Sequence, residues 1–245
     1  LYRTNSQSRA LEDSFRRSSI PYNIVGGIRF YERKEIKDII GYLSLIINTK
    51  DTISLRRVVN FPPRGIGLKT VDKCFEKAEK RKMELLDVLN EPDDMGIRGK
   101  QAEALRRFYG TIMKYNELLP KLNAGELVRT LLEEIGIKNH YSKNRTPDDN
   151  ERYENVLEFL RGVDEFMVRN PDGGLRDFLE EISLLTDLDN WNDQSNRVTL
   201  MTVHASKGLE FPVIFLSGLE DGLFPLYSSL DYKEKLEEER RLFYV

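Results

Sequence analysis

The chain has 245 residues, of which 40% are hydrophobic and 32% are charged, and 38 Lys and Arg nearly balance 41 Asp and Glu. This size and apolar content favour one large or two small globular domains and exclude a disordered chain. No apolar run approaches the roughly 20 residues that cross a bilayer, and the first residues carry no signal-peptide pattern. A single cysteine, Cys74, excludes an internal disulfide, and only two histidines leave too few ligands for a structural zinc site. We therefore expect a soluble, cytoplasmic protein that holds no metal.

Charge is separated along the chain. Residues 52–82 contain nine Lys or Arg and three acidic residues, a net charge of +6, whereas residues 146–196 carry a net charge of −10. A protein that separates its charge in this way can present a face to a polyanion such as DNA. Solvated helix faces explain the same charges equally well, so charge alone leaves both interpretations open.

The expected elements are α/β at both ends of the chain and helical in the middle. Residues 1–3 are predicted to end a strand, followed by a helix that Asn5 or Ser6 caps and that carries Leu11 and Phe15 on one face. A short strand follows at 22–25. Helical spacing of apolar residues then predicts seven helices, at 32–47, 52–59, 69–82, 98–118, 125–135, 151–168 and 174–186.

The last fifty residues change pattern again. Residues 198–203 are rich in β-branched side chains and predict a strand. Residues 212–216 form a continuous apolar run, which is typical of a strand buried in a parallel sheet. A final helix is predicted to start near Tyr232.

This order predicts a sheet domain interrupted by an all-α insertion. We expect residues 1–25 and 197–245 to form one discontinuous α/β domain and residues 26–196 to form the helical insertion. The chain is expected to cross between them at Gly26 and Gly27 and at residues 189–196. Since the sequence starts in a strand and stops in a helix, we also expect it to be part of a longer protein.

The first candidate site is a turn in the most basic stretch of the chain, with the residues Arg64, Gly65, Ile66, Gly67, Lys69 and Thr70. A Gly-apolar-Gly turn lets the backbone approach a phosphate closely, and the amides of the following helix point at the anion. This is the chemistry of a helix-hairpin-helix, which grips a duplex backbone without reading bases. A plain connection between two helices is the alternative, and the basic residues beside the turn favour phosphate binding.

The second candidate site is the loop at 201–211, between the two late strands. In an open parallel sheet, ligands bind beyond the carboxyl ends of the strands, where this loop falls. Four of its side chains can donate hydrogen bonds to phosphates: Thr202, His204, Ser206 and Lys207. Glu210 can accept a hydrogen bond from a ribose hydroxyl. A packed or surface role explains His204 as well, and residues 237–244 on their own are an ordinary solvated helix start.

The joint occurrence and order of these segments resembles superfamily 1 DNA helicases of the UvrD, Rep and PcrA type. The matching segments are residues 198–211, 212–215, 222–225 and 238–245 for the fifth motif and the start of the sixth, residues 1–9 for a strand end, and residues 26–38 and 64–67 for the accessory subdomain. The resemblance covers essentially the whole chain.

The resemblance implies a partial RecA-like, P-loop NTPase-like second motor domain, with a helical accessory subdomain that contains a helix-hairpin-helix-like turn. The full-length enzyme would use ATP and Mg²⁺ to move 3′ to 5′ along single-stranded DNA and to unwind duplex DNA in repair or replication. Its partners would be single-stranded DNA, the duplex junction, the first motor domain of the same polypeptide, and repair or replication proteins.

The resemblance also implies roles for individual residues. Arg3, Asn5, Thr202 and His204 match the family's single-strand contacts. Gly208 and Glu210 match its nucleotide site, with Glu210 at the ribose. The duplex contacts are expected at Arg64, Gly65, Ile66, Gly67, Lys69 and Thr70.

Parts of the family's nucleotide site do not occur in this sequence. There is no Gly-x-x-x-x-Gly-Lys-Ser/Thr, since Gly99 and Lys100 are followed by Gln101, which lacks the hydroxyl that would bind Mg²⁺. No apolar strand ends in Asp-Glu, and the family's arginine at the γ-phosphate would follow Val245. We therefore expect the chain alone to be inactive as an ATPase and to hold no nucleotide tightly. The alternative is a non-catalytic DNA-binding or regulatory module that retains the helicase fold.

Overall fold

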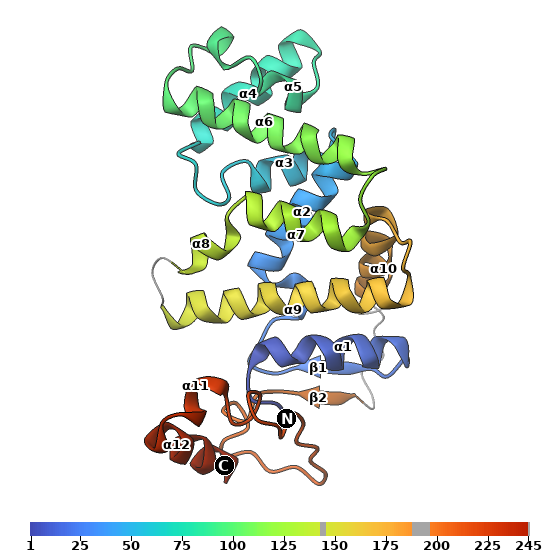
Figure 1. Cartoon of the computed structure of the whole chain (residues 1–245), viewed down its shortest axis with the longest axis vertical. Coiled ribbons are helices and arrows are strands. Elements are labelled where there is room, and N and C mark those ends of the chain that lie inside the picture. The colour runs from blue at the N-terminus through green and yellow to red at the C-terminus, as the bar shows by residue number, and fades with distance from the viewer. Residues whose placement is uncertain (143–145, 188–196, 245) are drawn as a thin grey trace. The chain divides into compact units, whose positions relative to one another are not determined.

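The computed structural model describes residues 1–142, 146–187 and 197–244, and it divides the chain into two compact units (Figure 1). Unit 1 comprises Leu1–Arg33 and Ser183–Val245, and unit 2 is Lys34–Ile182. The sequence placed the two divisions after residues 25 and 196. The expected crossing at 189–196 lies outside the described residues.

Unit 1 combines a small parallel sheet with helices. Its elements are η1 (Asn5–Gln7), α1 (Ser8–Arg17), β1 (Tyr22–Ile24), η2 (Phe30–Glu32), β2 (Val198–Leu200), α11 (Tyr227–Leu230) and α12 (Lys233–Phe243). Tyr22 of β1 lies opposite Val198 of β2 in a parallel register. The predicted strands at 22–25 and 198–203 are thus confirmed in part, as shorter strands.

The chain that continues from β2 makes backbone hydrogen bonds on both of its sides. The amide of Val25 donates to the Leu200 carbonyl at 2.9 Å, and the amide of Tyr2 donates to the Met201 carbonyl at 3.1 Å. Tyr2 also forms a parallel bridge with Thr202. Because successive carbonyls of an extended strand point to opposite sides, β2 and its continuation lie between β1 and the first residues of the chain.

The core of unit 1 forms where α1 covers this sheet. Tyr2, Tyr22 and Leu200 are buried, and Leu11 and Phe15 of α1 pack against them. The expected apolar face of α1 is therefore confirmed. The expected cap is wrong, because Asn5 and Ser6 lie within the 3₁₀ turn η1 and the N-cap position before it is occupied by Thr4.

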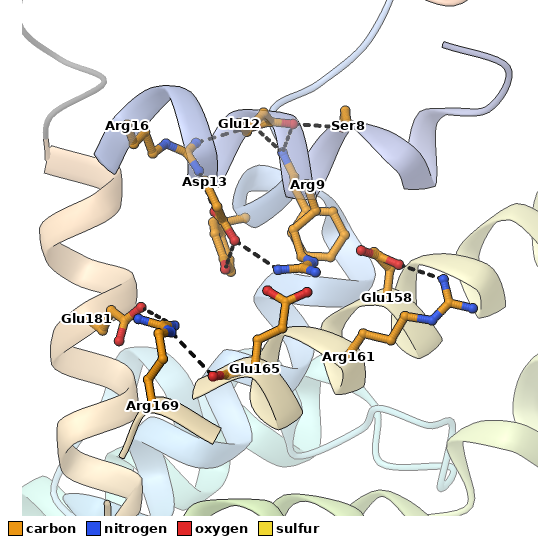
Figure 2. Close-up of polar contacts among 12 residues, drawn as sticks. Ser8, Arg9, Glu12, Asp13, Arg16, Glu158, Arg161, Glu165, Arg169 and Glu181 are labelled. Atoms are coloured by element: carbon orange, nitrogen blue, oxygen red, sulfur yellow. Dashed lines mark hydrogen bonds and ion pairs between the residues drawn. The ribbon is translucent and has the colours of Figure 1, made fainter. Parts of the chain in front are cut away.

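The opposite face of α1 carries buried charges that apolar spacing does not reveal (Figure 2). Glu12 accepts hydrogen bonds from the Ser8 hydroxyl at 2.7 Å and from the Phe30 amide at 3.2 Å. Asp13 pairs with Arg9 at 3.0 Å. Burial raises the pKa of Asp13, and the neighbouring Arg9 opposes that rise. These bonds tie α1 to the segment at Phe30, which leads toward unit 2.

The predicted buried strand at 212–216 is wrong. The structure has no strand there, and the side chains of Val213, Ile214 and Phe215 are 70%, 54% and 81% exposed. The segment bonds to the first residue, where the Ser217 amide and the Ser217 hydroxyl both donate to the Leu1 carbonyl, at 3.0 and 3.1 Å. An apolar run is buried only where another layer covers it, and no such layer covers this run within the described residues.

Unit 2 consists of helices. Its elements are α2 (Lys34–Ile47), α3 (Thr52–Val58), α4 (Leu68–Arg81), α5 (Leu85–Val88), η3 (Pro92–Met95), α6 (Lys100–Leu118), α7 (Ala124–Glu134), α8 (Ile137–Ser142), α9 (Pro147–Arg169) and the start of α10 (Leu175–Asp187). All seven predicted helices are confirmed, and the short α5 and α8 were not predicted. No described helix has both the length and the apolar character that a membrane crossing needs.

The middle of unit 2 is built around α2. Ile36, Ile39, Leu43 and Ile46 recur at helical spacing and are fully buried. α2 packs against α3, α6 and α9, so its apolar stripe is covered from several sides. This packing fixes α3, and with it the turn that leads to α4.

Candidate nucleic-acid interface

The turn between α3 and α4 has a fixed backbone. Its apolar residue, Ile66, is 1% exposed and anchors the turn in unit 2. Asn60 accepts hydrogen bonds from the Arg64 and Ile66 amides at 2.9 and 3.0 Å. Gly65 has a φ of +75°, a conformation that favours glycine, and Gly67 is the N-cap of α4 with no side chain bonded to the helix start. The buried Ile66 and the Asn60 side chain thus hold the turn in place, and the backbone at Gly65 and Gly67 is exposed to solvent.

Arg64 is directed into unit 2. Its guanidinium donates to the carbonyls of Phe61 at 2.5 Å and Pro62 at 3.1 Å, and to the Tyr42 hydroxyl at 2.6 Å. It also lies over the Phe108 ring, 5.5 Å from the centroid. Carbonyls that follow a helix end need such donors, so this side chain closes the end of α3 and stabilises the turn.

The remaining expected duplex residues divide between the surface and the interior. Lys69 is exposed in the first turn of α4. Thr70 is buried, and its amide donates to the Gly67 carbonyl at 2.9 Å. Gln101 at the start of α6 donates to the Gly65 carbonyl at 2.9 Å, which brings a second helix start beside the turn. Of the expected duplex residues, Gly65, Gly67 and Lys69 therefore lie at the surface, where Leu68 is exposed beside them.

Acidic partners compensate part of the basic stretch. Arg56 pairs with Asp72 at 3.0 Å, and Lys77 and Arg81 both pair with Asp94. Asp72 lies near the start of α4 and is already counted in that stretch, whereas Asp94 lies outside it, in η3. The net charge of residues 52–82 consequently overstates the charge that the unit offers to a ligand.

In unit 1, the loop after β2 carries the expected single-strand residues. Thr202 accepts a hydrogen bond from the Ala205 amide at 3.2 Å, which closes a turn directly after the strand. Ser206 is buried, and its hydroxyl donates to the Val203 carbonyl at 2.8 Å, so this donor is already used inside the loop. His204 and Lys207 are exposed on the same turn.

The first residues of the chain meet this loop. The bridge between Tyr2 and Thr202 places Arg3 beside it. Partial burial and the Arg3 guanidinium lower the pKa of His204, and Glu239 opposes them. The backbone carbonyl of Asn5 accepts a hydrogen bond from Arg33 at 3.0 Å. The structure therefore brings Arg3, Thr202 and His204 together at one strand end, with Asn5 two residues further along the chain.

The two expected nucleotide residues lie at the far end of the same loop. Gly208 has a φ of +79°, and a Cβ added there would meet no atom within 4 Å. Glu210 is exposed. Its carboxylate can accept hydrogen bonds from a hydroxyl pair, such as that of a ribose.

Several supporting residues were missed by the sequence analysis: Tyr42, Asn60, Gln101 and Glu239. Asn60 could have been found, because Asn near Pro often bonds to backbone amides in a turn. Tyr42 and Gln101 lie on other helices, and Glu239 is 236 residues from the Arg3 that it contacts. No local pattern signals such partners.

The chain is similar to known proteins along its whole length. Residues 1–245 match the family model of the UvrD-like helicase C-terminal domain. The chain is 39% identical over 249 residues to the ATP-dependent DNA helicase PcrA of Staphylococcus aureus strain Mu50 and, to the same degree, to that of Staphylococcus epidermidis strain RP62A. Each alignment covers 100% of this chain and 34% of the relative, so the chain spans about a third of their length.

Proposed function

Because the chain belongs to the family of the UvrD-like helicase C-terminal domain, we propose that it is the carboxy-terminal part of an ATP-dependent DNA helicase. The full-length protein moves 3′ to 5′ on single-stranded DNA and unwinds duplexes in repair or replication. The similarity to PcrA along the whole chain supports this assignment. The structural observation that supports it most is that Arg3, Thr202 and His204 lie together at the strand end of unit 1.

The two units have different roles in this proposal. Unit 1 is part of the second RecA-like motor domain, and the parallel pairing of β1 and β2 supports that assignment. Unit 2 is the accessory subdomain with a helix-hairpin-helix-like turn. The motor and accessory parts then divide after Arg33.

The strand end of unit 1 binds the single strand. Arg3 and His204 offer donors to phosphates, and Thr202 offers a hydroxyl at the end of β2. Asn5 completes the set from the turn η1, where its backbone is held by Arg33. Contacts of this kind position a strand without reading its sequence.

The turn of unit 2 binds the duplex backbone. Gly65 and Gly67 allow close approach of a phosphate, and Lys69 supplies the charge at the start of α4. Ile66 and Thr70 support the turn from the buried side. Arg64 stabilises the same turn through the carbonyls after α3.

The binding site for ATP and Mg²⁺ is completed by residues outside this chain. Gly208 and Glu210 fit the ribose end of a nucleotide, since the loop is open at Gly208 and the Glu210 carboxylate is exposed. When bound, ATP supplies the free energy for movement along DNA. Most of the residues for its phosphates come from the first motor domain, so the isolated chain is inactive.

Hydrolysis of ATP by the full-length protein tests the proposal. We expect single-stranded DNA to stimulate hydrolysis, and Glu210→Ala to raise the KM for ATP about tenfold through one lost charge-assisted hydrogen bond. Glu220→Ala removes another exposed carboxylate of unit 1 and serves as the control. A full-length protein that binds DNA and hydrolyses no ATP would instead be the non-catalytic module.

A further inference from the structure

Arg33 is the last residue of unit 1, and its side chain is directed back into that unit. Its Nη2 atom donates to the Asn5 carbonyl at 3.0 Å and to the Ser8 hydroxyl at 2.7 Å. Its Nε atom donates to the Ile28 carbonyl at 3.2 Å, and the guanidinium lies over the Phe30 ring, 5.1 Å from the centroid. One planar guanidinium therefore joins η1, the start of α1 and the segment that follows β1.

The turn η1 has few hydrogen bonds of its own. It is a single 3₁₀ turn, Asn5–Gln7, and a turn this short is weakly stabilised by its internal bonds. The Asn5 carbonyl accepts the amide of Ser8, which ends the turn, and Arg33 supplies a second donor to the same oxygen. The bond from Arg33 thus holds the turn from outside.

The side chain of Asn5 lies close to the segment that follows β1. A Cβ added at Gly27 would lie 3.4 Å from the Asn5 Oδ1 atom, so glycine lets this backbone pass close to the amide group. Arg33 bonds to the same segment at the Ile28 carbonyl. Arg33 therefore fixes η1 and the backbone beside the Asn5 amide relative to each other.

Burial makes Arg33 a supporting group and keeps it from DNA. Arg33 is 7% exposed, so a strand has little access to it. The Ser8 hydroxyl, which accepts from Arg33, donates in turn to Glu12 at 2.7 Å, and Glu12 is fully buried (Figure 2). Moving the guanidinium would leave buried acceptors without a donor, so the network resists displacement.

We propose that Arg33 is a positioning residue for the single-strand site: it holds η1 by the Asn5 carbonyl, so that the Asn5 amide is fixed where it bonds to the strand. The inference rests on the proposed function, in which Asn5 contacts single-stranded DNA. Arg33 itself does not touch the DNA. Because Lys34 begins α2, the same side chain fixes the point at which the chain leaves unit 1.

Two variants separate the bond to Asn5 from the rest of the network. Arg33→Lys keeps the positive charge and lacks the planar fork, so it cannot bond to all of the acceptors at once. Ser8→Ala removes another partner of Arg33 and one donor to Glu12, and it leaves the Asn5 carbonyl bonded to Arg33. Both variants loosen one buried network, so both should lower the melting temperature. Only Arg33→Lys should disturb Asn5.

Fluorescence anisotropy of a labelled oligothymidine with the full-length protein tests the proposal. Asn5→Ala should weaken binding about fivefold through one lost neutral hydrogen bond, and Arg33→Lys should weaken it about threefold through partial loss of the same bond. Ser8→Ala should leave the affinity unchanged. Adding Arg33→Lys to Asn5→Ala should weaken binding no further, although it still lowers the melting temperature, because Arg33 acts through Asn5.

The outcomes distinguish the positioning role from the proposed function. If Asn5→Ala binds like the parent protein, the proposed contact at Asn5 is wrong, and the positioning role is wrong with it. If Asn5→Ala weakens binding and Arg33→Lys does not, only the positioning role is wrong. Equal losses in Ser8→Ala and Arg33→Lys would contradict that role, and so would losses that multiply in the double variant. Arg33→Gln carries the same expectations and replaces the lysine variant if that variant does not fold.

Discussion

The Arg64 guanidinium donates to the Tyr42 hydroxyl at 2.6 Å, and that hydroxyl donates in turn to the Phe61 carbonyl. The sequence favoured Arg64 as a direct duplex contact because of its charge beside a Gly-Ile-Gly turn. The geometry gives the side chain a second role, since it donates hydrogen bonds to the carbonyls that follow α3. The two roles have different consequences for DNA binding.

Arg64→Met should destabilise the turn without removing a phosphate contact. We expect the free energy of unfolding to fall by about 2 kcal/mol, because the carbonyls lose a charged donor. Duplex affinity should fall by the same factor at every salt concentration, which leaves the salt slope unchanged. Tyr42→Phe should give a smaller loss that does not add to that of Arg64→Met. A slope lowered by about 0.9 with stability intact would make Arg64 a direct contact.

Lys69→Ala should act in the opposite way. Lys69 is exposed at the start of α4, so its removal should leave stability unchanged and lower the duplex salt slope by about 0.9. Lys80→Ala is the control, because Lys80 is exposed near the other end of the helix, about 16 Å along its axis. Fluorescence anisotropy of a labelled hairpin duplex measures the salt slope of each variant. Equal slopes for the two variants would show that the turn is only a connector.

Gly67→Val should block the close approach of a phosphate. Gly67 has a φ of −78°, and a Cβ there meets no protein atom within 4 Å, so the fold accepts the side chain. We expect about 1 kcal/mol of lost stability from the poorer N-cap, and about tenfold weaker duplex binding from lost phosphate contacts. Asp51→Ala, which removes the cap of α3, should cost similar stability and leave duplex affinity unchanged. Equal affinities for the two variants would exclude close approach at Gly67.

The His204 imidazole reports on the charges at the strand end. Its pKa lies below the ordinary value because of partial burial and Arg3, so we expect it to be neutral at pH 7. Arg3→Met removes a positive charge and should raise this pKa. Glu239→Gln removes a negative charge and should lower it. Nuclear magnetic resonance of the chain, whose other histidine is His140, measures both shifts, and shifts of equal sign would contradict this geometry.

The helices of unit 2 could be predicted because their apolar spacing coincides with burial. Ile36, Ile39, Leu43 and Ile46 follow one helical stripe and are all fully buried. The same reasoning failed at Phe215, since an apolar run shows that burial would be favourable and does not show what covers it. Within the described residues, Phe215 stays 81% exposed.

The positions of the candidate sites could be proposed from the sequence. The residues that orient their side chains could not be predicted from it. Local spacing identified Gly65 and Gly67, whose roles depend on their own backbone. The orientation of Arg64 depends on Tyr42, 22 residues away, and that of Arg3 depends on Glu239, 236 residues away. Charge alone suggests that an arginine meets a phosphate, but only the fold shows which of its donors are already used.

Strand displacement by the full-length protein tests whether this chain is part of a helicase. A labelled duplex with a 3′ single-stranded tail and ATP should be separated by the parent protein. Lys69→Ala should keep the ATP hydrolysis that single-stranded DNA stimulates and lose strand separation, because the proposed duplex contact lies in unit 2. Arg3→Met should lose both activities. If the parent protein separates no strands and hydrolyses no ATP on this substrate, the chain is not part of a helicase.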